Sequence, residues 1–209
     1  MVLTVLKQKK RVLKLYKSSI SRLTIHDVPF DVSGCPNIES LTFSFYKVDE
    51  YCKASNNLEN TTIQELSLTG LVFITIFQSG TPIEFKIPSS VHKLTLKWHR
   101  SVKEGKNVED VQVKPYSVVL PSNLDTLNNY CVPVVFPNLH MANNVQDVCF
   151  FYHDCHCVAS FIGSLPPSVQ HLLLDLENRS NLPQLPPLKV SLSHLPNLKF
   201  FYYDGLVTP

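Results

Sequence analysis

The sequence has few charged residues, few glycines and no long hydrophobic run, and each shortage excludes a class of protein. Charged residues make up only 17% of the chain and nearly balance at a net charge of +2, which does not suit a dedicated nucleic-acid binder. No stretch approaches the roughly 18 apolar residues that a membrane-spanning helix needs. The first apolar stretch is also too short for a secretory signal. We therefore expect an intracellular protein, cytoplasmic or nuclear, with neither a nucleic-acid nor a membrane partner.

The chain contains few glycines and many prolines, 6 against 15. Proline opposes long helices because it lacks an N–H donor and clashes with the preceding turn. The six cysteines are too dilute in 209 residues for a small disulfide scaffold, so we expect free thiols. The composition favours many short elements joined by rigid corners.

A short apolar pattern recurs along the chain: one apolar residue, two variable residues, a second apolar residue, one variable residue and a third apolar residue. Of the 24 apolar positions in eight such units, 23 are apolar or aromatic, and Asn129 is the exception. Alternating apolar residues place one face of a β-strand in a core. The central residues of the units are Leu23, Leu41, Leu66, Leu94, Leu127, Val148, Leu172 and Phe201.

Proline marks the entry to these units. It stands two or three residues before the first apolar position in five of them, as in Ile87-Pro88-Ser89-Ser90-Val91 and Leu165-Pro166-Pro167-Ser168-Val169. Proline at that place fixes the turn into a strand without removing a later ladder hydrogen bond. Because one short strand buries too little surface to be stable alone, we expect equivalent strands to stack in parallel around a continuous core.

These proline-containing units have the form I/L-P-x-S-V-x-x-L-x-L, which resembles leucine-rich repeats of the FNIP subtype and divergent repeats in fungal F-box-associated proteins. The central residues lie 18 to 33 positions apart, a range that brackets the usual repeat length of roughly 20–29 residues. The resemblance covers residues 20–203. The asparagine ladder that the family carries after the third apolar position is largely missing, so the turns must be closed differently.

The resemblance implies an α/β solenoid with a curved parallel sheet on its concave face and irregular, 3₁₀ or short helical return segments. It also implies a module that binds a protein partner on the concave face, as a substrate receptor in an F-box-like assembly or as a scaffold. We assign residues 20–209 to a repeat domain of about eight irregular units. Residues 1–19 form either an N-terminal cap or a first degenerate repeat.

The strand residues between the apolar positions predict the surface that meets the partner. They change along the chain from small polar residues, such as Thr24, Thr42 and Ser67, to aromatic and acidic ones. Aromatic residues dominate interface hot spots, and exposed aromatic clusters call for a cover. The predicted binding set comprises Lys97, which lies between the early and the later units, and Tyr130, Phe151, His171, Asp175, Phe200 and Tyr202 of the later units. The alternative is that Phe151, Phe200 and Tyr202 pack under a C-terminal cap or against neighbouring strands.

The run from Cys149 to Cys157 holds three cysteines and two histidines and suggests an alternative function. Thiolates and imidazoles are typical zinc ligands. A tetrahedral zinc site usually takes its four ligands from two separated pairs, and the sequence has no second pair at a standard spacing. On a strand, Cys155 and Cys157 would share a face. Cys155 could also pair with His171 as a nucleophile and base. A metal-dependent or Cys/His hydrolase is the alternative to our main prediction, a protein without enzymatic activity, metal or cofactor.

A basic run occupies the N-terminal segment. It is either a nuclear-import or anionic-surface patch, or the solvated face of a capping strand or helix. Its members are Lys7, Lys9, Lys10, Arg11, Lys14 and Lys17.

Overall fold

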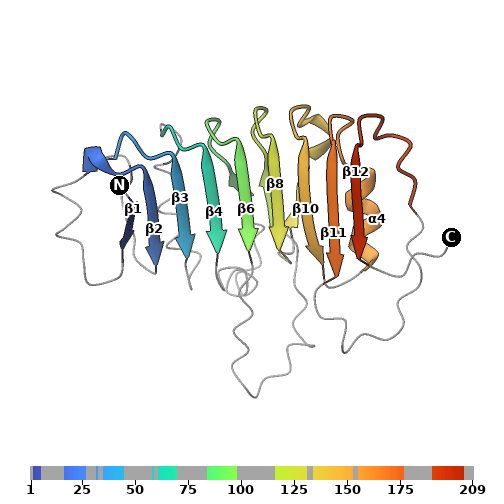
Figure 1. Ribbon diagram of the computed structural model, residues 1–209, viewed down its shortest axis with the longest axis horizontal. Helices are drawn as coiled ribbons and strands as arrows, with labels where there is room; N and C mark the ends of the chain where they lie inside the picture. The colour runs from blue at the N-terminus through green and yellow to red at the C-terminus, as the bar shows by residue number, and fades with distance from the viewer. Residues whose placement is uncertain are drawn as a thin grey trace, which may run out of the picture.

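A single parallel sheet dominates the computed structural model (Figure 1). The structure describes residues 2–5, 17–26, 32, 35–44, 58, 61–69, 84–97, 116–130, 134–152, 155–176 and 190–204. Within them, nine strands form the sheet in the order in which they occur along the chain, and every neighbouring pair is parallel. The strands are β1 (Val2–Val5), β2 (Arg22–His26), β3 (Ser40–Ser44), β4 (Glu65–Thr69), β6 (Lys93–Lys97), β8 (Thr126–Tyr130), β10 (Asp147–Tyr152), β11 (His171–Leu176) and β12 (Phe200–Asp204).

The segments that connect these strands carry the remaining elements. Short strands β5 (Glu84–Lys86), β7 (Tyr116–Val119) and β9 (Val134–Val135) form a second parallel sheet. Helix α4 (Cys155–Gly163) lies behind β11 and β12 in Figure 1, and η1 (Lys17–Ser19) and η5 (Leu139–Met141) are single 3₁₀ turns. The chain is therefore α/β with a mostly parallel sheet and few helices, as the sequence predicted. No helix among the described residues is long and apolar enough to span a bilayer.

The eight apolar units coincide with strands β2, β3, β4, β6, β8, β10, β11 and β12. Equivalent positions pair across the sheet, so that Leu41 stands opposite Leu23 and Leu66 opposite Leu41. The central residue is buried in seven units, and burial alternates with exposure along strands such as β2, β3 and β4. Buried residues from Ile20 to Leu195 form one cluster, which confirms the expected continuous core.

The return segments fill the space behind the sheet. Phe161 of α4 stacks on Phe150 of β10 with ring centroids 4.0 Å apart, and Val158 and Ile162 of the same helix are also buried. Asn129, the exception to the apolar pattern, is fully buried at the third apolar position of its unit, in β8. The second sheet of β5, β7 and β9 had no counterpart in the sequence prediction.

The last unit departs from the expected burial. Phe201 occupies its central position, where the prediction placed a core residue, but this side chain is 40% exposed. The physical reason is that β12 is the final strand of the sheet, so a neighbouring strand lies on one side of Phe201 alone among the described residues. The prediction that every unit places its central residue in the interior is therefore wrong for β12.

The turns before the strands share one hydrogen-bonding scheme. In six units the N–H of the first apolar residue donates to the carbonyl oxygen three residues earlier, as from Val91 to Pro88 and from Val169 to Pro166. Proline suits these turns because its fixed φ preorganises the backbone. Neighbouring turns are then joined by paired bonds, such as those from the N–H groups of His92 and Lys93 to the carbonyl of Gln64 at 2.8 and 3.0 Å.

A ladder of polar side chains joins the turns that precede the strands; it stands before the first apolar position and not after the third, where the asparagine ladder was expected. The residue just before the first apolar position is Asn, Ser or Thr in every unit, and several of these side chains donate to a backbone carbonyl of the preceding unit. Such bonds satisfy carbonyl groups that the strand ladder leaves free. This turn ladder includes Asn37, Thr62, Asn144, Ser168 and Asn197, with donor–acceptor distances of 2.6, 3.1, 2.8, 2.7 and 2.9 Å.

The N-terminal predictions are resolved only in part. Residues 2–5 form β1, which pairs in parallel with β2 and so adds a strand before the first unit. Most of the basic run lies outside the described residues, and only Lys17, at the start of η1, falls within them.

Candidate functional site

The sheet has an outward face, which carries the strand residues that lie between the buried positions. On β2, β3 and β4 these residues are small or polar, as in Thr24, Thr42 and Ser67, and they are half-buried by their neighbours. On β8, β10, β11 and β12 the outward positions include aromatic, apolar and acidic residues, such as Tyr130, Phe151, Leu173 and Asp175, beside the polar residues Thr126 and Asn128. All seven members of the predicted binding set lie on this face, on strands β6 to β12.

Four members of the set form one continuous row across the sheet. The backbone register places Lys97, Tyr130, Phe151 and Asp175 next to one another on β6, β8, β10 and β11. The rings of Tyr130 and Phe151 are stacked with their centroids 4.7 Å apart, and Lys97 Nζ lies 5.8 Å from the centroid of the Tyr130 ring. Stacked rings contribute about 0.5–1.5 kcal/mol beyond their buried area, and an exposed cation over a ring about 0.5–1 kcal/mol. The row is thus preorganised, with a cation at one end and a carboxylate at the other.

Cys149 lies in the adjacent row of outward residues, which is one row closer to the N-terminal ends of the strands. Its register neighbours are Asn128 on β8 and Leu173 on β11, and Leu173 is followed by Tyr202 on β12. Burial raises the pKa of the Cys149 thiol, a hydrogen bond from the Tyr130 hydroxyl lowers it, and the negative charge of Asp175 raises it. Burial also raises the pKa of the Tyr130 hydroxyl, as does its contact with Cys149. Cys149 is therefore a free thiol with little thiolate at neutral pH.

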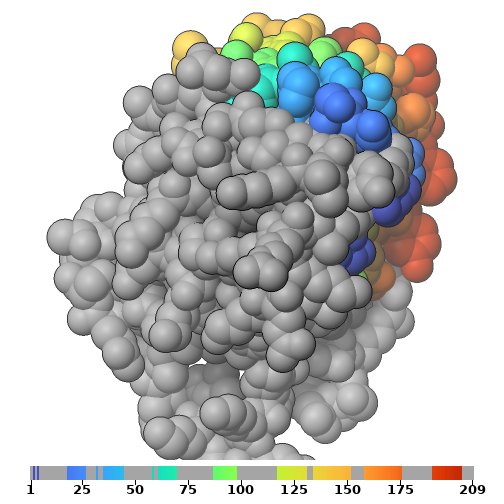
Figure 2. Space-filling view, turned by 90° about the vertical axis from the view of Figure 1, so that its left-hand side faces the viewer, coloured from blue at the N-terminus to red at the C-terminus, as the bar shows by residue number. Residues whose placement is uncertain are grey.

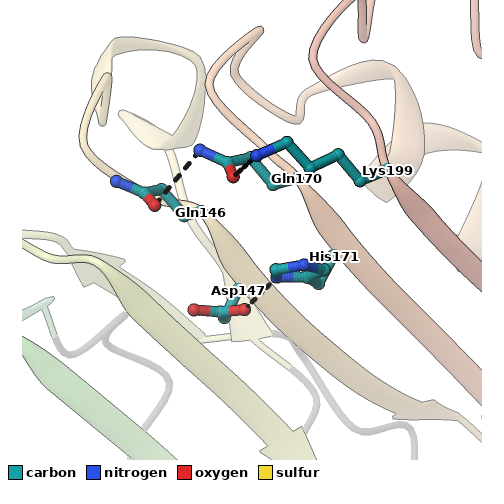
Figure 3. Close-up of polar contacts among 5 residues, drawn as sticks. All are labelled: Gln146, Asp147, Gln170, His171 and Lys199. Carbon is teal, nitrogen blue, oxygen red and sulfur yellow. Dashed lines mark hydrogen bonds and ion pairs between the residues drawn. The ribbon is translucent and has the colours of Figure 1, made fainter.

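A third row, at the strand N-termini, is polar and more open. His171 Nδ1 lies 2.6 Å from Asp147 Oδ1, with both side chains about half exposed (Figure 3). One position earlier, Gln170 Nε2 donates to Gln146 Oε1 at 3.2 Å, and Lys199 Nζ donates to Gln170 Oε1 at 2.8 Å. These contacts run along the rim of the sheet. They hold the side chains in one orientation, although exposed pairs contribute at most about 1 kcal/mol each.

The edge strand supplies the most exposed members of the set. Phe200 is 52% exposed and Tyr202 is 43% exposed. The alternative prediction, in which aromatic residues pack against neighbouring strands, agrees with Phe151, whose ring is stacked on Tyr130. It does not agree with Phe200 and Tyr202, whose side chains are about half exposed.

The cysteine and histidine cluster does not have the arrangement expected from sequence. Cys155 and Cys157 lie in the first turn of helix α4, so the strand on which they would share a face is not formed here. A helix forms here because the stretch from Val158 to Ile162 packs against the core. The side chains of residues 155–157, together with His153 and Asp154, lie outside the described residues. Among the side chains that the structure describes, no group of three His, Cys, Asp or Glu residues is placed to hold a metal ion.

The structure also separates the possible nucleophile pair. His171 is exposed on the outward face at the start of β11, where its Nδ1 atom contacts Asp147 Oδ1. Cys155 begins α4, which lies on the core side of the sheet (Figure 1). The sheet itself therefore stands between the two backbone positions.

Two features of the site did not emerge from the sequence. The Gln146–Gln170–Lys199 chain was missed because these residues precede the strands, although they occupy equivalent positions in their units. The contact of Tyr130 with Cys149 was missed because it is diagonal across the strand pair rather than directly opposite.

Comparisons with known proteins return no match: no family model, no curated protein and no solved structure is significantly similar to this chain.

Proposed function

We propose that this chain is a leucine-rich-repeat-type solenoid that binds a partner protein on the outward face of its sheet, through the C-terminal half. The support for a solenoid is the order of the strands, since each unit adds one parallel strand beside the previous one in constant register. In such an arrangement each repeat contacts mainly its neighbours, and the sheet face becomes the concave side. A receptor or scaffold role follows from a surface of that kind.

The observation that carries the binding proposal is the uneven distribution of aromatic residues on one face. Apart from Asn129, the inward positions follow the same apolar rule from β2 to β11, so the core does not require Tyr130, Phe151 or Tyr202 to be aromatic. Half-exposed aromatic side chains cost solvation free energy unless a partner covers them. Buried aromatic anchors beside charged groups are typical of the residues that dominate binding energy.

The chemistry of the row suggests what the partner presents. Tyr130 and Phe151 offer a flat apolar surface with Asp175 at one end and Lys97 at the other. A matching surface would place an apolar or aromatic side chain over the stacked rings and a basic group near Asp175. Such a contact would be strengthened by the exclusion of water from the centre of the interface.

The test is affinity capture from extracts of the source organism, quantified by mass spectrometry, with the tagged chain and two double variants. Tyr130→Ala with Tyr202→Ala removes aromatic contacts in the C-terminal half, whereas Thr24→Ala with Thr42→Ala changes the polar half of the same face. Since a hot-spot residue contributes at least about 2 kcal/mol, we expect the first variant to lose more than about tenfold of the bound partner. The second variant should retain it.

Circular dichroism must show that both double variants are folded. A folded aromatic variant that still captures the same proteins, or equal losses in the two variants, would contradict the proposal.

A further inference from the structure

One carboxylate on the outward face lacks the basic neighbour that the others have. Of the three aspartates whose side chains the structure describes, two face an imidazole. Asp147 Oδ1 lies 2.6 Å from His171 Nδ1, and Asp125 Oδ2 lies 3.6 Å from His92 Nδ1. The third, Asp175 on β11, is half-buried and has no ion pair with any of the described residues.

Asp175 stands at one end of the aromatic stack. The centroids of Tyr130 and Phe151 are 4.7 Å apart, close to the separation of about 4.8 Å between neighbouring strands, so the rings are stacked along the row from β8 to β10. The next position of the row, on β11, is Asp175. Phe151 stacks on no second ring among the described residues, and its other face is directed toward β11.

A cation of the chain itself lies at the opposite end of the stack. Lys97, on β6, places its Nζ atom 5.8 Å from the centroid of Tyr130. The negative face of an aromatic ring attracts a cation at this distance. The β11 end offers a ring face of the same kind together with the negative charge of Asp175. This end therefore attracts a cation more strongly than the end that Lys97 already occupies.

Side-chain length gives this end the shape of a step. A phenylalanine ring extends farther from a sheet than an aspartate carboxylate, so Phe151 forms the wall of the step and Asp175 forms its floor. Leu173, two residues earlier on the same face of β11, is half-buried and adds an apolar surface beside the floor. In Figure 2, which views the molecule from the β1 side, orange and red atoms of the C-terminal strands reach the right-hand margin, on the side of the outward face.

We propose that this step binds an arginine side chain of the partner, with the guanidinium stacked on Phe151 and its N–H groups donating to Asp175. A guanidinium is planar, so it can lie flat on a ring while its edge carries donors for a carboxylate. The ammonium group of lysine has no such plane, and an apolar side chain would cover the charge of Asp175 without pairing it. The aliphatic stem of the arginine would lie on Leu173.

This inference rests on the proposed partner site in the C-terminal half and adds the chemistry of its anchor, a basic segment of polypeptide that carries an arginine.

Peptide display on the immobilised full chain tests the inference. Random peptides are selected for binding, and a selected peptide is synthesised with its arginine kept, changed to lysine, or changed to citrulline, which has the planar shape without the charge. Isothermal titration calorimetry measures binding to the unaltered chain, Asp175→Asn and Phe151→Leu. Asp125→Asn is the matched control, because it neutralises a half-exposed carboxylate in the turn before β8, outside the step.

We expect the selected peptides to share an arginine, and we expect its change to citrulline to weaken binding to the unaltered chain at least about tenfold. Lysine should restore only part of this loss. In Asp175→Asn, the change to citrulline should alter binding less than about twofold, because both changes remove the same contact. Phe151→Leu should weaken binding of the arginine peptide, whereas Asp125→Asn should bind every peptide as the unaltered chain does.

Selection of no peptide, or of peptides that share no arginine, would overturn the inference. So would equal affinities of the arginine and lysine peptides, or a citrulline effect that persists in Asp175→Asn. The comparison of peptides on the unaltered chain needs no variant, and circular dichroism checks that the variants are folded. The proposed function is judged separately, by partner capture with the variant that combines Tyr130→Ala and Tyr202→Ala.

Discussion

The two halves of the sheet obey the same rule on the inside and different rules on the outside. Strands β2, β3 and β4 bury Leu23, Leu41 and Leu66 in the same column in which β10 and β11 bury Val148 and Leu172. On the outward face, the polar row of the first half gives way to stacked rings and carboxylates in the second. The inward residues follow one rule throughout the sheet, whereas the outward residues differ between its two halves, and this difference is the basis of the proposed partner site.

The largest expected effect is on the free energy of unfolding, which should fall much more for a substitution in an interior unit than for one in the edge unit. Leu94→Ala removes a fully buried central residue of β6 and should lower the free energy of unfolding by about 3 kcal/mol, because it leaves a cavity in a packed core. Phe201→Ala changes the equivalent position of β12, which is already 40% exposed, and should cost no more than about 1 kcal/mol. Urea denaturation measures both. Equal losses would show that β12 is packed like an interior strand.

A smaller effect is expected when one position of the C-terminal half is converted to the N-terminal type. Phe151→Thr removes the stacked contact with Tyr130 and should cost about 1.5 kcal/mol. Ser44→Ala, in the same row of β3, is the control and should change stability by less than about 0.5 kcal/mol. Thermal unfolding followed by circular dichroism would compare them. If Phe151→Thr were neutral, the stacking would not stabilise the face.

The turn ladder offers a matched pair of serines at equivalent positions. Ser168 Oγ donates to the carbonyl of Val145 at 2.7 Å, whereas Ser90 Oγ is buried with no hydrogen-bond partner among the described residues. Ser168→Ala should therefore cost about 1 kcal/mol, while Ser90→Ala should be neutral or slightly stabilising. Denaturant midpoints at constant m-value measure the difference. A larger loss for Ser90→Ala would argue against the ladder as the link between the turns.

The smallest effect concerns the thiol of Cys149, beside the row of Tyr130 and Phe151. Because burial raises the pKa of Cys149, its alkylation by iodoacetamide should become rapid only at a higher pH than that of a model thiol peptide. Asp175→Asn removes a negative charge that raises this pKa and should move the midpoint of the pH profile downward. Peptide mapping by mass spectrometry follows Cys149 alone. An unchanged midpoint in Asp175→Asn would show that the two groups do not interact.

The same pKa shift has a consequence for stability. The native thiol keeps its proton at a pH where the unfolded chain has lost it, so this group makes the native state less stable as the pH rises above the pKa of the unfolded thiol. Cys149→Ser should reduce this decrease in native-state stability at alkaline pH.

Most of the sheet could be predicted from sequence because its signal is local and repeated. The alternation around Leu41 or Leu172 appears within five residues, and the same pattern predicted which side chains face outward. Helix α4 could not be predicted in the same way, because its cysteine-rich start has no strong helical periodicity and its buried face depends on contacts with Phe150. The exposure of Phe201 depends on the absence of a neighbouring strand among the described residues, which local sequence does not encode.

The proposed site was predictable as a set of positions but not as a geometry. Register brings Tyr130 beside Phe151 from units that are separated by about 20 residues in the sequence, and this register follows the buried apolar positions rather than the variable length of the connecting segments. The contact of His171 with Asp147 and the glutamine chain along the rim depend on side-chain orientations that a strand pattern does not predict.

The most direct test of the binding face is photo-crosslinking with p-benzoylphenylalanine placed at one position at a time. Leu173 lies in the middle row of the C-terminal half, and Ser67 lies in the same row of the polar half. We predict crosslinks to a partner protein from position 173 and none from position 67. Crosslinks from position 67 alone, or from neither position, would contradict a partner site in the C-terminal half of the sheet.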